Sequence, residues 1–389
     1  MIEPALPPEC YSGVKWYDLE CKEIFGKLWL LVGLRQQLDT HDSFITRQFN
    51  GVSVLVQNIQ GELRAFRNVC AHRGMPIQTE PFGVRKLVCP YHGWGYREDG
   101  SLRGIANAAI YGICDARKAS IRLHSYPLEI IGDFVFVNLA SEPLAITEQY
   151  SPDMIAVLTA VSASFGTEVS FSHFTCDYNW KLNFENVLDW NHVQFVHPQS
   201  LGPLLADKSS PASYIKRPSS LLFGQGALLA GVQTNGAIDL NVPVALQDLS
   251  IIGRKELPYA PSWFSGLMEA PCDQGAFLNC KLFPNANFVS VHGEQFYLEQ
   301  FVPVSPDRID YHSWVFTSRL KKDVPVQPQL LWWLHHSEKR VIDEDAVLLT
   351  ALHASLKSAS CVGVMGDHEG QLVAMGQWYL QRLSEGGNQ

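Results

Sequence analysis

The pattern of apolar and polar residues divides the chain into a helical start, a β-rich part and a longer mixed part. Apolar residues recur at helical spacing over 17–31, which predicts a helix. The period then changes to two, with alternating residues at 52–56 and a Gln60-Gly61 turn that together predict a hairpin. Another alternating stretch, 133–139, predicts a strand that closes the β-rich part.

The longer part combines a predicted helix with antiparallel strands. Residues 152–158 have a helical pattern, whereas alternation predicts strands at 287–291, 295–304 and 310–317. Residues 199–262 are rich in Pro, Ser and Gly and lack periodicity, which is typical of a functional loop or a partly disordered segment. We therefore expect an α+β protein, with a small all-β domain and a larger domain whose antiparallel sheet is surrounded by helices.

Composition is that of a soluble globular protein. With 389 residues and 46% hydrophobic content, the chain can bury the cores of two domains. No run of about 18 apolar residues would span a membrane, and the start MIEPALPPEC lacks the regions of a signal peptide, so we expect a cytoplasmic protein. The nine cysteines have no regular spacing, which favours reduced thiols over a disulfide framework.

Two short stretches each place one cysteine and one histidine close together. Cys70 and His72 are separated by one residue, and Cys89 and His92 by two. A zinc site more usually pairs its cysteines on one arm and its histidines on the other. Two Cys on one iron and two His on the other are the ligands of a Rieske [2Fe–2S] centre, which these arms predict. A structural zinc knuckle is the alternative.

A second candidate metal site lies in residues 179–198, NWKLNFENVLDWNHVQFVHP. Asp189 and His192 are three residues apart, so a continuous helix would place them on one face. His197 precedes Pro198, which disfavours helix at the residue before it, so we expect His197 just past the helix end, free to turn back toward His192. Two ordinary histidines on a partly apolar helix are the alternative interpretation.

Both stretches resemble those of the Rieske non-heme iron oxygenases, the catalytic alpha subunits of aromatic ring-hydroxylating systems. The likeness also includes residues 20–32, the NWK triplet with Glu185-Asn186 after it, and a C-terminal segment around Asp345 and Glu369. It covers most of the chain, although residues from about 201 to 261 match nothing useful.

The resemblance implies a Rieske domain over 41–142, a catalytic non-heme iron domain over 143–389, and an N-terminal helical segment, 1–40, that packs on the catalytic domain. It implies a [2Fe–2S] cluster held by the four Cys and His residues of the two arms. It further implies a mononuclear Fe(II) held by two histidines and one carboxylate, with O2 as co-substrate. The histidines of this second site are His192 and His197.

The carboxylate ligand has three candidates, Asp343, Glu344 and Asp345. On a helix, Asp343 would face Lys339 and Glu344 would face Arg340, so both have exposed ion-pair explanations. Asp345 would share its face with apolar residues: Val341, Ile342, Leu348, Leu349 and Leu352. A carboxylate there is costly unless it is paired or bound to metal, so we predict Asp345, where the family's aspartate ligand also falls. A buried, hydrogen-bonded aspartate is the alternative.

The resemblance assigns Asp189 another role. In the family, the acidic residue three before the first histidine ligand bridges that ligand, here His192, and the second Rieske histidine, here His92, of a neighbouring subunit. A carboxylate that accepts two imidazole N–H bonds would orient both rings and link the two metal centres. This implies a ring of subunits, most simply a homotrimer. A helix charge without a partner is the alternative, and Glu185 and Asn186 are candidate supporting groups.

Charge is distributed unevenly. Residues 61–125 contain 10 Lys/Arg and 5 Asp/Glu, a balance of +5, so the rest of a chain of net charge −9 carries −14. Nucleic-acid binding is disfavoured, because the chain is acidic and its basic residues are not interleaved with a stacking platform. The positive segment suits docking of an acidic electron donor, a ferredoxin or flavin reductase. A surface charged only for solubility is the alternative.

The implied activity is hydroxylation of a small organic substrate with O2 and electrons from NAD(P)H. We rank an aromatic substrate first. Monooxygenation or demethylation of a quaternary ammonium of the choline, carnitine or betaine type is the alternative, which the two-residue gap between Asn186 and Asp189 favours. A Rieske electron carrier without oxygenase activity is the alternative of another class. Seven aromatic residues could line a pocket for an aromatic ring or form a cage for a quaternary ammonium, although we expect most of them in the core: Trp263, Phe264, Phe277, Phe283, Phe288, Trp332 and Trp333.

Overall fold

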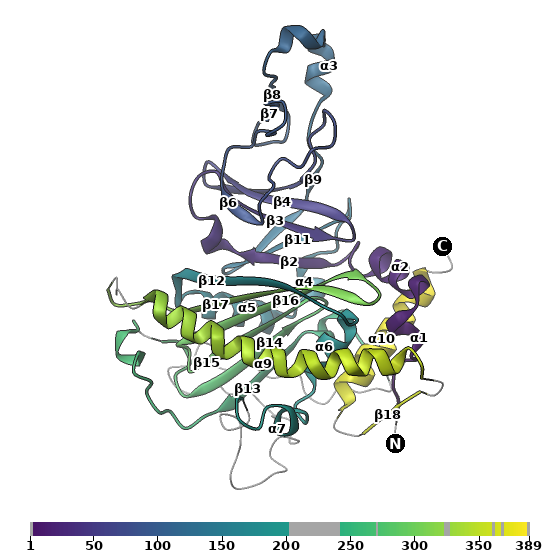
Figure 1. Cartoon of the computed structure of the whole chain (residues 1–389), viewed down its shortest axis with the longest axis vertical. Coiled ribbons are helices and arrows are strands. Elements are labelled where there is room, and N and C mark those ends of the chain that lie inside the picture. Colours follow the sequence, from purple (N-terminus) through teal and green to yellow (C-terminus); the bar gives the residue numbers. More distant parts are fainter. Residues whose placement is uncertain are drawn as a thin grey trace. The chain divides into compact units, whose positions relative to one another are not determined.

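The computed structural model describes residues 3–201, 242–269, 271–322, 327–359, 362–366 and 369–386. They form two compact units, a small unit of Phe25–Leu144 and a large unit of Met1–Ile24 with Ala145–Gln389 (Figure 1). The small unit consists mainly of strands, and the large unit combines one antiparallel sheet with helices. The expected α+β class is therefore confirmed.

The small unit contains three antiparallel sheets. The five-stranded sheet has the order β6 (Phe82–Val84), β3 (Ser43–Phe49), β4 (Val52–Ile59), β5 (Glu62–Arg67) and β9 (Ser125–Tyr126). The others are β10 (Leu128–Ile131), β11 (Phe134–Asn138) and β2 (Trp29–Leu34), and β7 (Gly95–Tyr96) with β8 (Leu102–Gly104). Three short helices complete the unit: η1 (Arg35–Leu38), η2 (Ala108–Tyr111) and α3 (Asp115–Ser120).

The predicted hairpin of the small unit is confirmed. Strands β4 and β5 pair in antiparallel register from Val54 opposite Arg67 to Ile59 opposite Glu62. Both residues of the connecting turn, Gln60 and Gly61, have positive φ, of 57° and 93°. Positive φ at both positions twists a two-residue turn in the sense that the flanking strands require.

The predicted helix over 17–31 is only half correct. Helix α2 covers Val14–Glu23, and the chain then forms strand β2, whose six residues are all buried. Strand β2 pairs with β11, so residues 25–40 belong to the small unit and not to one N-terminal segment 1–40. A short, wholly apolar run fits a buried helix or a buried strand equally well. Here the pairing with β11 determines that these residues form a strand.

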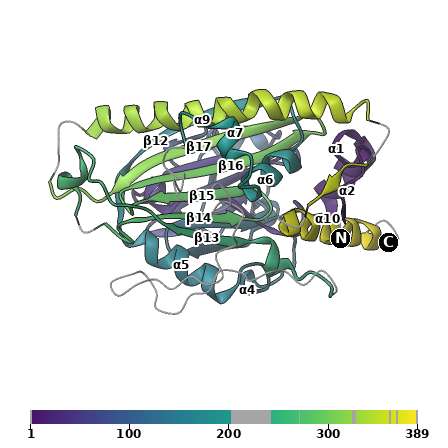
Figure 2. The same ribbon diagram turned by 90° about the horizontal axis from the view of Figure 1, so that it is seen from below.

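The large unit is built on a six-stranded antiparallel sheet. Its order is β12 (Phe165–Cys176), β17 (Arg308–Ser318), β16 (Gln295–Ser305), β15 (Ala286–Val291), β14 (Ala276–Leu282) and β13 (Ile251–Glu256). The long helix α9 (Gln327–Leu356) runs beside β12 and β17, as Figure 2 shows. The other α-helices are α1 (Glu9–Ser12), α4 (Ile146–Gln149), α5 (Pro152–Ser162), α6 (Trp180–Leu188), α7 (Val193–Val196) and α10 (Gly370–Gly386).

The remaining elements of the large unit are short. Strand β1 (Glu3–Pro4) pairs with β18 (Val364–Met365), and two 3-10 helices, η4 and η5, cover Leu246–Leu249 and Ser265–Leu267. The predicted helix at 152–158 and the three predicted strands correspond to α5, β15, β16 and β17. Strand β13 lies inside 199–262, where we expected no regular structure, while 202–241 fall outside the described residues.

A buried charged cluster fixes α6 within the large unit. Glu20 on α2 accepts hydrogen bonds from Trp180 Nε1 (2.7 Å) and Tyr379 Oη (2.6 Å), and it contacts Lys181 Nζ. The ammonium of Lys181 also lies over the rings of Tyr11, Trp180 and Tyr379, 5.1–5.3 Å from their centroids. Because a buried charge is stable only when it is paired, this cluster holds α6 in one position relative to α2 and α10.

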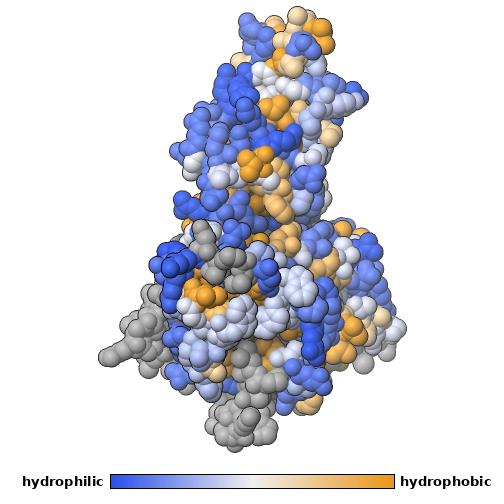
Figure 3. All heavy atoms as spheres, turned by 60° about the vertical axis from the view of Figure 1, so that its left-hand side comes forward, coloured by the Kyte–Doolittle hydropathy of each residue, from blue (hydrophilic) through white to orange (hydrophobic). Residues whose placement is uncertain are grey.

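On the face seen in Figure 3, the surface of each unit is mainly hydrophilic and contains smaller hydrophobic patches. None of the helices in the described part of the chain combines the length and apolarity of a membrane-spanning segment. No disulfide joins any of the eight cysteines within the described ranges.

Candidate metal centres and active-site cavity

The chain leaves the helical conformation at Asp189, so the prediction that Asp189 and His192 share one continuous helix is wrong. Helix α6 ends at Leu188, and Asp189 is extended, with φ −83° and ψ 126°. The Asp189 side chain accepts the backbone N–H bonds of Asn191 (2.7 Å) and His192 (3.3 Å). Such local bonds offer the backbone an alternative to the helix, which explains the break.

His192 and His197 flank the short helix α7. His192 is the residue before its first turn, and His197 follows its last residue, Val196. The prediction that His197 lies just past a helix end, before Pro198, is confirmed. One helical turn between the two histidines brings their rings to 5.4 Å between centroids.

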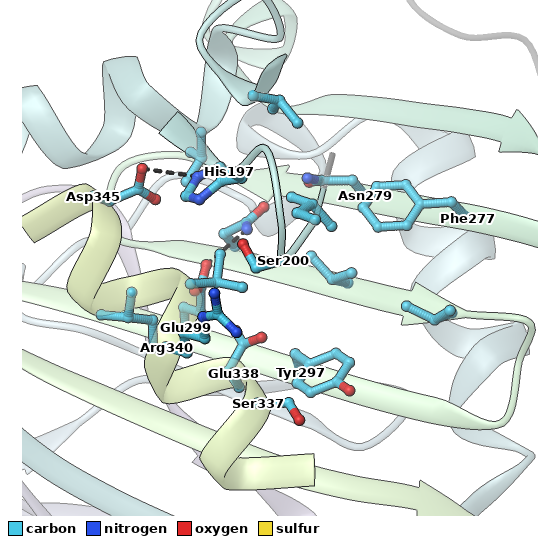
Figure 4. A pocket seen from close by; sticks show the side chains of 18 of the residues that line it. His197, Ser200, Phe277, Asn279, Tyr297, Glu299, Ser337, Glu338, Arg340 and Asp345 are labelled. Carbon is cyan, nitrogen blue, oxygen red and sulfur yellow. Dashed lines mark hydrogen bonds and ion pairs between the residues drawn. The ribbon is translucent and has the colours of Figure 1, made fainter. Parts of the chain in front are cut away.

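Helix α9 brings Asp345 to the same place. Asp345 Oδ1 lies 3.0 Å from His197 Nε2 and 3.8 Å from His192 Nε2 (Figure 4). One ligand atom from each of the three residues lies within 4.8 Å of the others. Two ligands at about 2.1 Å from one ion and at right angles stand about 3.0 Å apart, so this spacing suits a shared metal ion.

The donor set fits a mononuclear iron. Asp345 Oδ1 is buried and makes no hydrogen bond within the described residues, although it faces two imidazole nitrogens. A buried carboxylate oxygen normally has a partner, and a metal ion would supply one. Two imidazoles and one carboxylate with further positions open are the facial triad of non-heme Fe(II) oxygenases.

A second carboxylate lies behind each imidazole. Asp189 Oδ2 is 3.4 Å from His192 Nδ1, and Glu344 Oε2 is 2.8 Å from His197 Nδ1. Burial disfavours the charge of Asp189, but bonds from His192 and Asn191 outweigh it and lower the pKa of Asp189. Carboxylates in this position fix the tautomer and the orientation of an imidazole ligand.

The contact between Glu344 and His197 was not predicted. The expected ion pairs are confirmed, since Arg340 Nε lies 3.2 Å from Glu344 and Lys339 contacts Asp343. Glu344, however, also accepts a bond from Ser200 Oγ (2.5 Å) besides that from His197. The helical phase of Glu344 alone suggested a surface residue. Only the position of α9 against residues 197–200 shows that Glu344 also bonds to His197.

The cluster arms of the small unit form two similar turns. The carbonyls of Cys70 and Cys89 accept the N–H bonds of Gly74 (3.0 Å) and Gly93 (3.1 Å), each four residues later. Both glycines have positive φ, of 78° and 66°, a conformation that favours glycine. The thiols of Cys70 and Cys89 are buried, and they are close enough for Cys89 to raise the pKa of Cys70, which burial raises most.

The two histidines of the arms are also adjacent. The rings of His72 and His92 lie 4.7 Å apart between centroids, and both are only half-buried. Trp94 stacks on His72 at 4.8 Å, and Tyr96 Oη lies 3.1 Å from Cys70 Sγ. Paired thiols inside and paired imidazoles toward the surface fit the Cys2His2 donor set of a Rieske cluster.

A cavity of about 590 Å³ adjoins the histidine and aspartate triad within the large unit. Its wall comes from α6, α7, α9 and the strands β14, β15 and β16 (Figure 4). Of the seven aromatic residues proposed for the pocket, only Phe277 lines it. Phe264, Phe283 and Phe288 are core residues, because their strands and loops turn them away from the cavity, whereas Trp263, Trp332 and Trp333 are exposed. The rings that line the cavity are Tyr178, Trp190, Phe277, Tyr297 and Tyr311.

Comparison with known proteins agrees with both sites. The family model of the ring hydroxylating alpha subunit (catalytic domain) matches residues 155–385, and that of the Rieske [2Fe-2S] domain matches 28–126. A glycine betaine monooxygenase oxygenase subunit of Chromohalobacter salexigens is 32% identical over 210 residues, covering 52% of this chain and 45% of that protein. A carnitine monooxygenase oxygenase subunit of Escherichia coli K12 is 29% identical over 200 residues, covering 50% and 52%.

These alignments span about half the length of the curated relatives. A solved quaternary ammonium Rieske monooxygenase is similar over nearly its whole length, with a TM-score of 0.71, 18% identity, and 100% of this chain and 96% of that chain covered. Identity that low supports the fold alone. The catalytic-domain model covers more than half of the chain, and the Rieske model covers the cluster arms. The chain therefore belongs to the ring-hydroxylating alpha-subunit family and carries a Rieske [2Fe–2S] domain together with that family's catalytic domain.

Proposed function

We propose that the protein is the terminal oxygenase component of a system that hydroxylates a small organic substrate with O2 and electrons from NAD(P)H. The observation that carries this proposal is the convergence of His192, His197 and Asp345 at the wall of a cavity of about 590 Å³. A metal site with open positions beside a substrate-sized cavity is what such a reaction requires.

His192, His197 and Asp345 would hold Fe(II), and Cys70, His72, Cys89 and His92 would hold the [2Fe–2S] cluster. When bound, the cluster supplies single electrons and the Fe(II) activates O2. The side chains around them orient these ligands and shape the space beside them.

Each group near the triad has its own task. Glu344 accepts the Nδ1–H of His197 and so directs Nε2 toward the iron site. Asp189 Oδ2 lies 3.4 Å from Nδ1 of His192, a longer contact whose charge favours a proton on Nδ1 and leaves Nε2 for the iron site. Val193 and Ile342 line the cavity as buried apolar residues, which excludes water from the side where the substrate lies.

We place a quaternary ammonium substrate before an aromatic one, which reverses the order expected from sequence. The printed names of the relatives, glycine betaine and carnitine monooxygenase oxygenase subunits, support this order. So do two carboxyl groups of the cavity wall that are not assigned to the metal site, Glu299 and Glu338. The reaction would then be monooxygenation or demethylation.

The proposal includes the remaining partners. A ferredoxin or flavin reductase would dock on the small unit, where the half-exposed rings of His72 and His92 lie closest to solvent. Asp189 would bridge His192 and His92 of a neighbouring subunit in a homotrimer; the solved relative whose structure is described in terms of inter-subunit electron transfer supports this arrangement. Dependence on NAD(P)H favours a cytoplasmic location.

Metal analysis tests the proposal. The oxygenase should contain three iron atoms per chain, two in the cluster and one in the mononuclear site, whereas a Rieske electron carrier would contain two. Asp345→Ala should lose the third iron and keep the red-brown cluster absorption, while Asp343→Ala, in an exposed pair with Lys339, should keep both. A wild-type protein with two irons and full cluster absorption would refute oxygenase function.

A further inference from the structure

Two glutamates of the cavity wall lie beside one another and are not members of the metal triad. Glu299 lies on β16 and Glu338 on α9, and both line the cavity (Figure 4). Their carboxyl groups are close enough for each to affect the ionisation of the other. Burial raises the pKa of both groups, and the proximity of Glu299 raises that of Glu338 further. A positive charge beside the pair would oppose both shifts.

Neighbouring side chains hold Glu299 in place. Asn287 lies opposite Glu299 in the sheet register and donates from Nδ2 to Oε2 at 2.8 Å. Tyr311 Oη donates to Oε1 at 2.7 Å. Both oxygens of Glu299 are thus engaged by neutral donors, which position a carboxylate but do not cancel its charge.

No basic residue neutralises the pair among the described residues that line the cavity. The one lysine or arginine of that wall is Arg340, and its guanidinium pairs with Glu344 at 3.2 Å. The other acids of the wall, Asp189 and Asp345, face the histidines of the metal site. Without such a partner the buried pair favours protonation, and a cation that enters the cavity from solvent would stabilise its ionised form instead.

The surroundings favour an organic ammonium over a metal ion. A Ca²⁺ or Mg²⁺ ion would need six or more oxygen ligands with free lone pairs, and Asn287 and Tyr311 already occupy both oxygens of Glu299. A methylated ammonium needs a negative potential and aromatic faces instead of directed bonds. Tyr297 and Tyr311 supply rings in the same wall.

We propose that Glu299 and Glu338 form the site that binds the positively charged group of the substrate, an inference that rests on the proposed oxygenase function. Glu338 precedes Asp345 on α9 by seven residues, two helical turns, so both lie on one helix face. At 1.5 Å per residue their backbones are about 10 Å apart. The cationic group of the substrate would thus bind on the same wall of the cavity as Asp345. The distance between the two sites matches the length of a small substrate molecule.

Binding of two probes of equal shape tests the proposal. Choline carries a quaternary ammonium, and 3,3-dimethylbutan-1-ol is its uncharged isostere. Affinities would be measured by calorimetry without O2, on the protein with both metal sites filled. We expect choline to bind about 10–100-fold more tightly than the isostere, because a charge-assisted contact has that effect.

Two variants locate the site. Glu299→Gln and Glu338→Gln should each weaken choline binding about 10-fold or more and leave the isostere unaffected. Asp343→Asn removes a carboxylate from the exposed side of the same helix and should change neither affinity. Cluster absorption and thermal unfolding would show that each variant is folded.

The outcomes separate this inference from the proposed function. Equal binding of both probes by the wild-type protein, or unchanged choline affinity in both glutamine variants, would overturn the cation site. In either case, the oxygenase proposal would still stand if adding arenes changed the spectroscopic signal of the mononuclear iron. Conversely, a preference for choline that depends on both glutamates in a protein holding only two irons would support the site and reject the oxygenase proposal.

Discussion

Replacing Glu344 by alanine should weaken binding of the mononuclear iron without affecting the cluster. In the wild-type protein, the Glu344 carboxylate accepts bonds from His197 Nδ1 (2.8 Å), Ser200 Oγ (2.5 Å) and Arg340 Nε (3.2 Å). The variant leaves Nδ1 of a buried histidine, 1% exposed in its side chain, without its acceptor. His197 would then be free to rotate or to change tautomer.

The size of the effect follows from that lost bond. Removing the group that orients a histidine ligand typically lowers metal affinity about 10–100-fold, which corresponds to about 1.4–2.7 kcal/mol. Glu344→Gln keeps an oxygen that can accept the Nδ1–H bond and should lose less. Asp343→Ala is the matched control, because Asp343 precedes Glu344 on α9 and forms an exposed ion pair with Lys339. An exposed pair of this kind contributes at most about 1 kcal/mol to stability.

The assay is competition for Fe(II) with a chelator of known affinity, with the visible absorption of the cluster as an internal standard for folded protein. We expect Glu344→Ala to release iron at the lowest chelator concentration, then Glu344→Gln, then Asp343→Ala together with the wild type. If Glu344→Ala retained iron as firmly as Asp343→Ala, Glu344 would be only a surface ion-pair residue and the assigned orientation of His197 would be incorrect.

Three further predictions concern the donor, the oligomer and pH. Reduction by the donor protein should slow steeply with added salt if the basic residues of the small unit steer it, and a rate indifferent to ionic strength would contradict this; the residues concerned are Arg85, Lys86, Arg97 and Lys118. Mixed oligomers of His72→Ala and His192→Ala chains should regain product formation if electrons cross between subunits, and Asp189→Ala in the chain that keeps its iron should abolish this rescue; inactive mixed oligomers with both metal sites filled would reject the inter-subunit path. Burial raises the pKa of Glu185 from 4.5 to about 7, although the hydrogen bond from Tyr11 lowers it in part. Because the folded protein binds this proton more tightly than the unfolded chain, folding is favoured at low pH, and this stabilisation is lost as pH rises from about 4.5 to 7. Glu185→Gln should therefore raise the melting temperature at pH 8 and hardly change it at pH 5, and an equal shift at both would contradict the titration.

Local spacing was sufficient wherever the chemistry lies within a few residues. The cluster arms each hold a cysteine and a histidine two or three positions apart, so their turns could be predicted without knowledge of the rest of the chain. His197 before Pro198 is a similar case, because the proline restricts the backbone of its neighbour. The strands at 286–318 could likewise be predicted, and their observed bounds lie within two residues of the predicted ones.

Local spacing failed where two conformations satisfy the same pattern. Residues 29–34 are apolar throughout and gave no period, so the pairing of β2 with β11 decided their conformation. Asp189 has the spacing of a helical partner for His192, yet its side chain bonds to the next backbone N–H groups and ends the helix. Side-chain hydrogen bonds to the backbone and the backbone hydrogen bonds of a helix are close in energy. The periodicity of apolar residues does not indicate which of the two forms.

The sequence by itself determined which residue types surround each metal and which family the chain resembles. Helical phase also selected Asp345 as the carboxylate that faces His197. Only the tertiary structure decided how two other carboxylates of α9 are used: Glu344 behind His197, and Glu338 beside Glu299. The contacts of these three carboxylates are with residues 39 to 148 positions away in the chain, and such contacts arise from the packing of α9 against the sheet and α7, which no local pattern encodes.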